Sequence, residues 1–266
     1  MPQTRNPLEV HCRMTNSTVR KLLRWLIFPL LWIGVWQLIA LWVDREVLVP
    51  TPWTVAVRLT ALLQTAAFWS TVAFSILRIT AGFLCGVILG TLTGILTAKL
   101  PLSDDLLSPL LTVIRATPVA SFIILALVWM GKDAIPVFIS FLMVSPIMQS
   151  NVGMGVRSTP QALLEMAQVY RVPSLRRIRA IYFPAVLPYF SAGCRTCLGL
   201  AWKAGVAAEV ISLPMRSIGR QLYYSKLYLE TVDVFAWTVT VIVLSLLIEK
   251  LLSALLLRLT KGGERK

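Results

Sequence analysis

Long apolar runs bounded by charged residues are the feature of this 266-residue sequence that most limits how it can fold. The first run extends from Trp25 to Val43, with Lys21 and Arg24 before it and Asp44 after it. A helix needs about 20 consecutive, mostly apolar residues to cross a bilayer, and this run meets that requirement. A cleavable signal peptide would have a shorter apolar core and a small-residue cleavage site, so we expect the run to be retained.

Five further runs have the same character and predict about six transmembrane helices in total. They fall within residues 79–98, 111–130, 135–156, 184–208 and 234–257. The fifth run is the least apolar, because it contains Arg195 and Lys203. The prediction is an all-α, polytopic membrane helix bundle. Its expected parts are a cytoplasmic arm at 1–24, a transmembrane domain at 25–257 that includes a cytoplasmic loop at 157–183, and a cytoplasmic tail at 258–266.

The composition supports a membrane protein over soluble alternatives. Charged residues make up 14% of the chain, against roughly 25% in an average soluble domain. The net charge of +14 does not indicate a nucleic-acid binder, because the basic residues flank apolar runs, where they attract anionic lipid. The Cys194-x-x-Cys197 pair has no second pair, and His11 has no neighbouring ligand in the sequence, so no metal site is expected.

The placement of Lys and Arg predicts the orientation, since cytoplasmic segments keep the excess of these residues. With the N-terminus in the cytoplasm, most of the 26 Lys and Arg residues fall on that side, including Lys99 after the second run and Arg115 near the start of the third. Both termini are therefore expected in the cytoplasm.

Four glycines repeat at every fourth position in the second run: Gly82, Gly86, Gly90 and Gly94. This spacing places them on one helix face, where another backbone can approach closely. We interpret the repeat as a helix-packing surface rather than as a direct part of a transport path.

Charged residues inside the predicted spans are candidates for a translocation path, because they are costly in lipid and often functional. The candidates are Arg78, Arg195, Lys203 and Glu209, and Lys203 is expected to pair with Glu209 at the outer end of the fifth span. The alternative is that these groups reach an interface or form structural ion pairs. Trp202 is expected to anchor the helix at the membrane interface.

The polar stretch from 157 to 182 is predicted as two short helices outside the bilayer. Its composition favours helix, Pro160 suits a helix start, and Pro173 interrupts the pattern. From the residues alone it either docks a cytoplasmic partner or lies on the membrane with its arginines on lipid headgroups.

Residues 165–184 resemble the Glu-Ala-Ala signature loop of ABC importer permeases, in which a glycine and an Ile-x-Leu-Pro element follow. The positions in register are Glu165, Ala167, Ile181 and Pro184. Met166, Arg171 and Phe183 depart from the pattern. Since Arg171 replaces the glycine, the turn is expected to be made differently, with Pro173 supplying the break.

Further segments are similar to the nitrate, sulfonate and taurine branch of that family. They are 48–52, 77–83, 115–118 and 201–209, in the family's order and spacing. The resemblance implies a multi-pass protein of the bacterial inner membrane. It also implies that Glu165, Ala167, Arg171, Pro173, Ile181 and Pro184 form a segment that couples to an ATPase.

The chain has no G-x-x-x-x-G-K-[ST] phosphate loop, so it is not expected to hydrolyse ATP. The resemblance implies two permease copies, a cytoplasmic ATPase dimer that binds ATP and Mg, and a binding protein that delivers a small solute, expected to be an anion. The main alternative is an ion-coupled secondary transporter, which would usually need inverted repeats and midplane carboxylates that the sequence does not show. A membrane enzyme is disfavoured because the spans lack a catalytic constellation.

Overall fold

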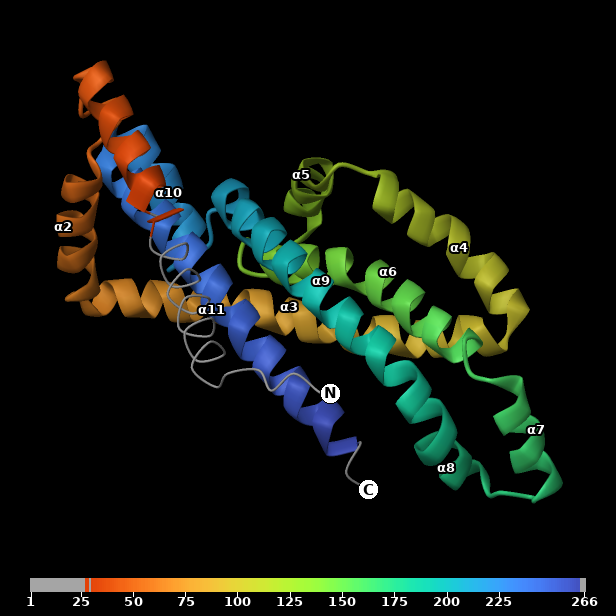
Figure 1. Ribbon diagram of the computed structural model, residues 1–266. Helices are drawn as coiled ribbons and strands as arrows, with labels where there is room; N and C mark the ends of the chain where they lie inside the picture. Colours follow the sequence, from red (N-terminus) through yellow and green to blue (C-terminus); the bar gives the residue numbers. More distant parts are fainter. Residues whose placement is uncertain (1–26, 29, 264–266) are drawn as a thin grey trace, which may run out of the picture.

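The computed structural model describes residues 27–28 and 30–263, and the regular structure of this part is helical throughout (Figure 1). The helices follow one another as Leu30–Val43, α2 (Pro52–Leu63), α3 (Ala66–Lys99), α4 (Pro101–Ala116), α5 (Val119–Trp129), α6 (Ile135–Arg157), α7 (Gln161–Val169), α8 (Ser174–Arg177), the π-helical turn η1 (Ile178–Tyr182), α9 (Phe183–Ser212), α10 (Ile218–Leu227) and α11 (Thr231–Gly263). The arm predicted at 1–24 lies outside the described residues. The all-α prediction is confirmed.

Side-chain caps and prolines determine where the first long helices begin. The Thr51 hydroxyl accepts the backbone N–H of Thr54 at 3.2 Å, and Pro52 follows at a position that needs no N–H. Thr65 caps α3 in the same way, accepting the N–H of Phe68 at 3.3 Å. Because of this cap, α3 begins well before the predicted start of the second span at residue 79.

Among the described residues, three helices are long and apolar enough to cross a membrane: α3, α6 and the Thr231–Arg258 part of α11. α4 and α5 pass the same test only as a pair bent by 104°, so the prediction of one continuous span at 111–130 is wrong. The bend lies at Thr117 and Pro118, because proline disfavours a helical conformation in the residue before it. α9 has 30 residues, but its three charges lower its hydropathy and it does not pass.

α3, α6 and α9 form the centre of the bundle, and α3 approaches α6 at the glycine repeat. An added Cβ at Gly82 or Gly94 would meet a backbone carbonyl oxygen of α6 at 2.2 or 2.6 Å. At Gly86 or Gly90 it would meet a side-chain Cβ atom of α6 at 2.6 Å. These distances leave no room for a side chain, so glycine at all four positions permits the close contact of the two helices.

Trp202 connects α9 to α11 inside the protein and is not an interfacial anchor, contrary to the prediction. Its side chain is 3% exposed, and its indole N–H donates to the carbonyl of Val241 at 3.2 Å. It belongs to a buried apolar cluster that includes Phe68 and Trp237, whose rings stack 5.1 Å apart. Packing against α11 therefore buries the apolar ring of Trp202 and also provides a hydrogen-bond acceptor for its single N–H donor.

α2 is joined to the start of α11 by an ion pair between Arg58 and Asp233. The guanidinium donates to both carboxylate oxygens, with 2.7 Å between Nη2 and Oδ2. The hydrogen bond from this side chain to Asp233 raises the pKa of Arg58 above its ordinary value. A two-point contact of this kind fixes orientation as well as distance.

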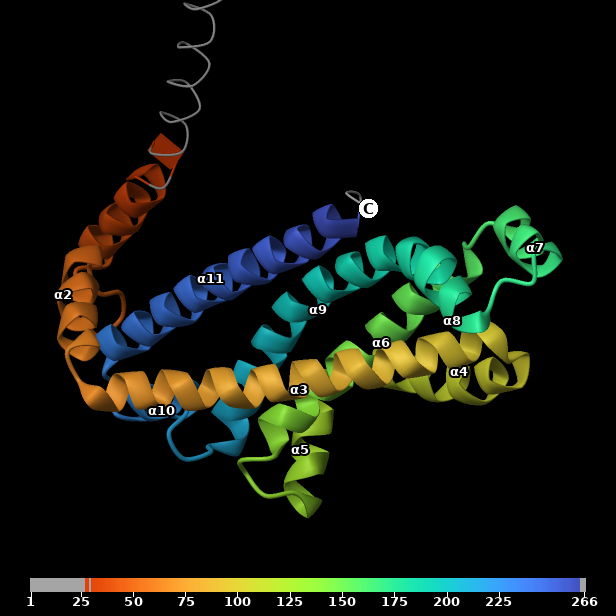
Figure 2. The same cartoon turned by 90° about the horizontal axis from the view of Figure 1, so that it is seen from below.

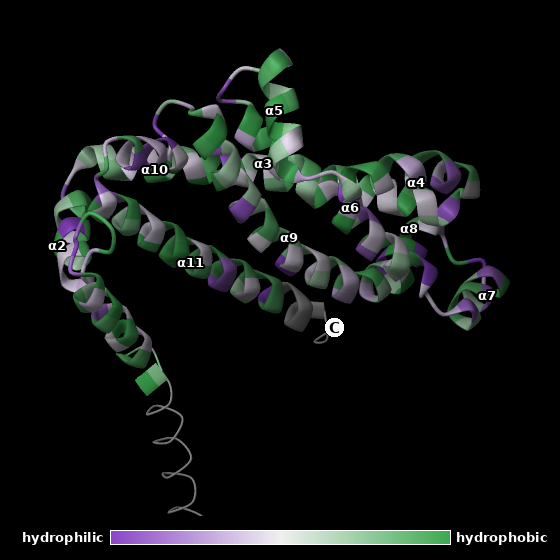
Figure 3. Ribbon diagram, turned by 90° about the horizontal axis from the view of Figure 1, so that it is seen from above, coloured by the Kyte–Doolittle hydropathy of each residue, from purple (hydrophilic) through white to green (hydrophobic). Residues whose placement is uncertain are grey.

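The bundle has two distinct ends. α7, α8 and the last turns of α11 lie toward the lower edge of Figure 1, whereas α2, α10 and the start of α11 lie at its upper left. Figure 2 shows that α5 projects from the side of the bundle, away from α11. In Figure 3, α5 and most of α11 are hydrophobic, whereas hydrophilic residues interrupt α4 and α7. We call the two ends the α7–α8 end and the α10 end.

Candidate functional site

The segment between α6 and α9 folds into the two short helices, α7 and α8, that were expected (Figure 1). α7 begins directly after Pro160, and α8 begins after Pro173, which takes its N-cap position. A proline at a helix start needs no donor and presets the backbone angle. The two prolines therefore define where each helix begins.

Arg171 makes the turn after α7 in the left-handed conformation, with φ = 50°. The N–H of Val172 donates to the carbonyl of Ala167 at 2.8 Å, and the N–H of Arg171 donates to Gln168 at 3.1 Å. This is the helix-ending pattern that usually has glycine at the left-handed position. The expectation that Arg171 changes the turn is therefore wrong: the turn takes the conformation that glycine favours, with an arginine in it.

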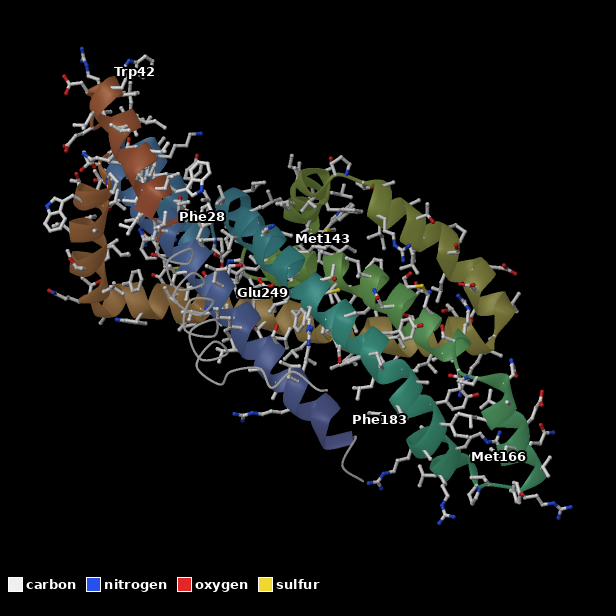
Figure 4. The ribbon with its side chains drawn as sticks, viewed as in Figure 1. Phe28, Trp42, Met143, Met166, Phe183 and Glu249 are labelled. Atoms are coloured by element: carbon white, nitrogen blue, oxygen red, sulfur yellow. The ribbon has the colours of Figure 1, made fainter. Side chains whose placement is uncertain are left out.

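Apolar side chains project from α7 and α8 although these helices lie beyond the long spans. They include Met166, Val169, Tyr170 and Leu175, with exposed fractions of 47, 77, 77 and 81%. Figure 4 shows Met166 on α7, at the same end of the bundle as α8. We call these four residues the coupling patch. A grouped set of exposed apolar side chains outside the membrane spans is typical of a protein-docking surface.

The other residues of the predicted coupling segment have structural positions. Glu165 is exposed on α7, whereas Ala167 is fully buried. Ile181 is half-buried in η1, and Pro184 lies in the first turn of α9. A proline within a continuous helix would clash with the carbonyl four residues before it, and the wider π turn lies directly in front of Pro184.

Glu209 is completely buried at the α10 end of α9. Its Oε2 accepts a hydrogen bond from the Ser75 hydroxyl at 2.8 Å and one from the backbone N–H of Gly219 at 3.2 Å. The Ser75 oxygen in turn accepts the N–H of Ile218 at 2.9 Å. Glu209 Oε1 has no hydrogen-bond partner among the described residues, and Arg78 Nη1 lies 3.8 Å from it. The carboxylate thus holds the start of α10 against α3.

Arg78 extends this cluster to two loops. Its Nη2 donates to Asp133 at 2.6 Å and to the carbonyl of Met215 at 2.7 Å, and its Nη1 donates to the carbonyl of Arg216 at 3.2 Å. Since the guanidinium joins the loops before α6 and after α9, the arrangement is that of a structural tie.

The expected pair of Lys203 with Glu209 is not formed. The two residues are six positions apart, which leaves them about 120° short of two full helical turns and therefore on different faces of α9. Lys203 is exposed, and in the part of the chain that the structure describes it makes no ion pair. The same holds for Arg195 on this helix. Glu209 is paired with Arg78 instead.

A polar pocket of about 180 Å³ lies between α4 and α6. α4 contributes Asp104, Ser108, Thr112 and Arg115, whose spacing of four, four and three places them on one helix face. α6 contributes Gln149, Ser150 and Arg157. The opposite face of α4 is apolar and exposed, with Leu102, Leu106, Leu110 and Val113. The helix therefore turns a polar side to α6 and an apolar side away from the bundle.

Arg115 lies level with the middle of α6, not at a cytoplasmic end as predicted. Its Nη2 donates to the carbonyl of Pro146 at 2.7 Å, and Pro146 is equally far from Ile135 and Arg157. The error followed from treating residues 99–115 as a loop between spans. α4 is a helix that returns along α6, so its last turn lies at depth. The polar spacing along α4 is the signal that would have revealed this.

The described residues contain no group of three or more His, Cys, Asp or Glu side chains that could hold a metal ion.

Comparison with known proteins establishes the family. The family described as "Binding-protein-dependent transport system inner membrane component" matches residues 82–261, more than half of the chain. The chain belongs to this family. It is the permease subunit of an ABC importer, and the ion-coupled secondary transporter is thereby set aside.

Relatives of this permease span most of its length. A protein of Brucella abortus named as an ABC transporter permease is 30% identical over 236 residues, covering 88% of this chain and 92% of the relative. A protein of Bacillus subtilis named as an aliphatic sulfonates transport permease is 29% identical, covering 79% and 77%. A bicarbonate transport system permease of Synechocystis is 33% identical, covering 59% and 56%.

The permease also has the fold of a solved ABC transporter. An inward-facing MetNI methionine ABC transporter matches with a TM-score of 0.53 at 16% identity, covering 73% of this chain and 93% of that one. Family membership makes this chain a multi-pass inner-membrane component of a binding-protein-dependent transport system.

Proposed function

We propose that two copies of this permease form an alternating-access path for a small oxyanion, with an ATPase dimer at the α7–α8 end and a binding protein at the α10 end. The relatives named for sulfonates and bicarbonate, both of which are anions, support the choice of cargo class. Nucleotide and Mg are bound by the ATPase, and this chain drives transport by changing conformation when its partners do.

The distribution of charge supports a cytoplasmic α7–α8 end. Five arginines lie in or beside the α7–α8 segment: Arg157, Arg171, Arg176, Arg177 and Arg179. The last turns of α11 lie on the same side of the bundle as α8 in Figure 1, which also brings the C-terminal part of the chain to this side. The excess of arginine predicts that both termini are cytoplasmic.

Lys203 remains our candidate for the path. It is exposed on an otherwise apolar stretch of α9, and a lone ammonium in contact with lipid is costly. Exposure to a water-filled path or to the second copy removes that cost. Arg78 and Glu209 serve instead as the structural tie described above.

The coupling patch is the observation that carries the proposal, since exposed apolar side chains outside the long spans are typical of a protein-docking surface. The test is co-purification of the permease with its ATPase, comparing Tyr170→Glu with Tyr228→Glu. Both tyrosines are largely exposed, at 77 and 67%, but Tyr228 lies at the α10 end. Tyr170→Glu is expected to lower ATPase recovery by about tenfold or more, because a buried charge at an interface centre costs a few kcal/mol and each 1.4 kcal/mol is about tenfold in affinity.

Tyr228→Glu is expected to leave ATPase recovery unchanged. Equal recovery from both variants would overturn the assignment of the coupling patch. In proteoliposomes that contain the complex, the binding protein that stimulates ATP hydrolysis when loaded would identify the cargo. Stimulation only by a protein loaded with a cationic or neutral solute would contradict the choice of an oxyanion.

A further inference from the structure

We propose that the polar pocket between α4 and α6 binds a small oxyanion at mid-membrane depth, with the Arg115 guanidinium as its charged ligand. This inference rests on the proposed function and identifies one binding site for the solute along the proposed path. Neither the relatives nor the family description assigns such a site.

The guanidinium of Arg115 has most of its donors free. A guanidinium carries five N–H donors, and within the described chain this one uses a single hydrogen bond, to the carbonyl of Pro146. It forms no ion pair with any described carboxylate. Planar, bidentate donation to an oxyanion is the interaction for which this fork of donors is suited.

The remaining pocket lining adds neutral donors around the cation. The Ser108 and Ser150 hydroxyls form no side-chain hydrogen bonds with other described residues, so both can donate to a ligand. Gln149 is 7% exposed and spends one amide hydrogen on Thr97 at 3.0 Å, which leaves the other available. Cation, hydroxyls and amide together match the acceptors of a small oxyanion.

The other charges of the pocket largely cancel and lie nearer the α7–α8 end. Asp104 accepts a hydrogen bond from Arg157 at 2.8 Å, and Arg157 also donates to the carbonyl of Thr97 at 3.1 Å. Asp104 is the only carboxylate among the described lining residues. Since it is neutralised by Arg157, the net charge that a ligand meets beside Arg115 is positive.

Depth separates this pocket from a lipid-headgroup site. Pro146, which accepts from Arg115, lies eleven residues from each end of α6, or about 16 Å along the helix axis. That is about half the thickness of the hydrocarbon core, so where α6 spans the bilayer a lipid phosphate lies too far away to reach the guanidinium. An uncompensated arginine at this depth is costly and marks a path for a charged solute.

The test labels single cysteines in the full-length permease, held in phosphatidylcholine nanodiscs, with its native cysteines replaced by alanine. Thr112→Cys lies in the pocket, and the control Leu110→Cys lies on the exposed apolar face of the same helix. Each is treated with an anionic and with a cationic methanethiosulfonate of similar size. At Thr112→Cys the anionic reagent is expected to react about tenfold faster, because a cation nearby concentrates anions.

Methanesulfonate at millimolar concentration should slow labelling of Thr112→Cys, and adding Arg115→Gln should remove both the preference and the protection. Leu110→Cys should react with neither reagent. Equal rates for the two reagents at Thr112→Cys, or no reaction there, would overturn the oxyanion site. This labelling result does not depend on the ATPase. A complex that hydrolyses ATP but shows no anion preference at Thr112→Cys would contradict the anion site alone. An anion-selective pocket in a chain that binds no ATPase would contradict the proposed function alone.

Discussion

Arg171 occupies a backbone conformation that costs a non-glycine residue about 1 kcal/mol, so Arg171→Gly should tighten the end of α7. Amide hydrogen exchange at Val172, whose N–H closes the turn, should slow by about fivefold. The matched control is Arg176→Gly in α8, where glycine weakens a helix and exchange should accelerate. Faster exchange at Val172 in Arg171→Gly would mean that the arginine itself stabilises the turn.

Glu209 should be needed for the stability of the folded protein rather than for passage of the solute. Glu209→Ala removes the acceptor for Ser75 and Gly219, leaving buried donors unpaired, and is expected to cost about 3 kcal/mol. Thermal unfolding followed by tryptophan fluorescence would report this as a lower Tm. Glu249→Ala on α11 replaces an exposed carboxylate (Figure 4) and should leave the Tm unchanged. Similar Tm values for the two variants would rule out the structural tie.

At the scale of elements, the α3–α6 contact depends on the absence of side chains. Gly90→Val adds atoms where a Cβ alone would lie 2.6 Å from Met148, so we expect overpacking of about 3 kcal/mol or more and little folded protein after extraction. In Gly199→Ala on α9 the added Cβ has no neighbouring atom within 4 Å. This variant should raise the Tm, since alanine favours helix. Monodispersity on size exclusion distinguishes the variants. A well-folded Gly90→Val would show that the contact tolerates separation.

How far the sequence predicts these elements depends on whether local chemistry decides the outcome. The predicted limits of α6 are correct to one residue, and the interruption at Pro173 is correct, because hydropathy and proline geometry act locally. The course of α4 could not be read from hydropathy, since a helix with one polar face resembles a loop. The partners of Glu209 could not be predicted from the sequence either. Ser75 and Arg78 belong to another helix, and no local rule indicates that they lie beside Glu209.

For the molecule as a whole, the arrangement of the two ends predicts which surfaces each side of the membrane can reach. Tyr170 and Tyr228 are both largely exposed and lie at opposite ends of the bundle. In intact cells, an impermeant maleimide should label Tyr228→Cys and leave Tyr170→Cys unlabelled until the inner membrane is permeabilised, because positive charge retains the α7–α8 end in the cytoplasm. The parent chain with its native cysteines replaced by alanine provides the background. Labelling of Tyr170→Cys in intact cells would show that the protein has the opposite orientation in the membrane. The coupling patch would then lie outside the cytoplasm, where no ATPase could reach it.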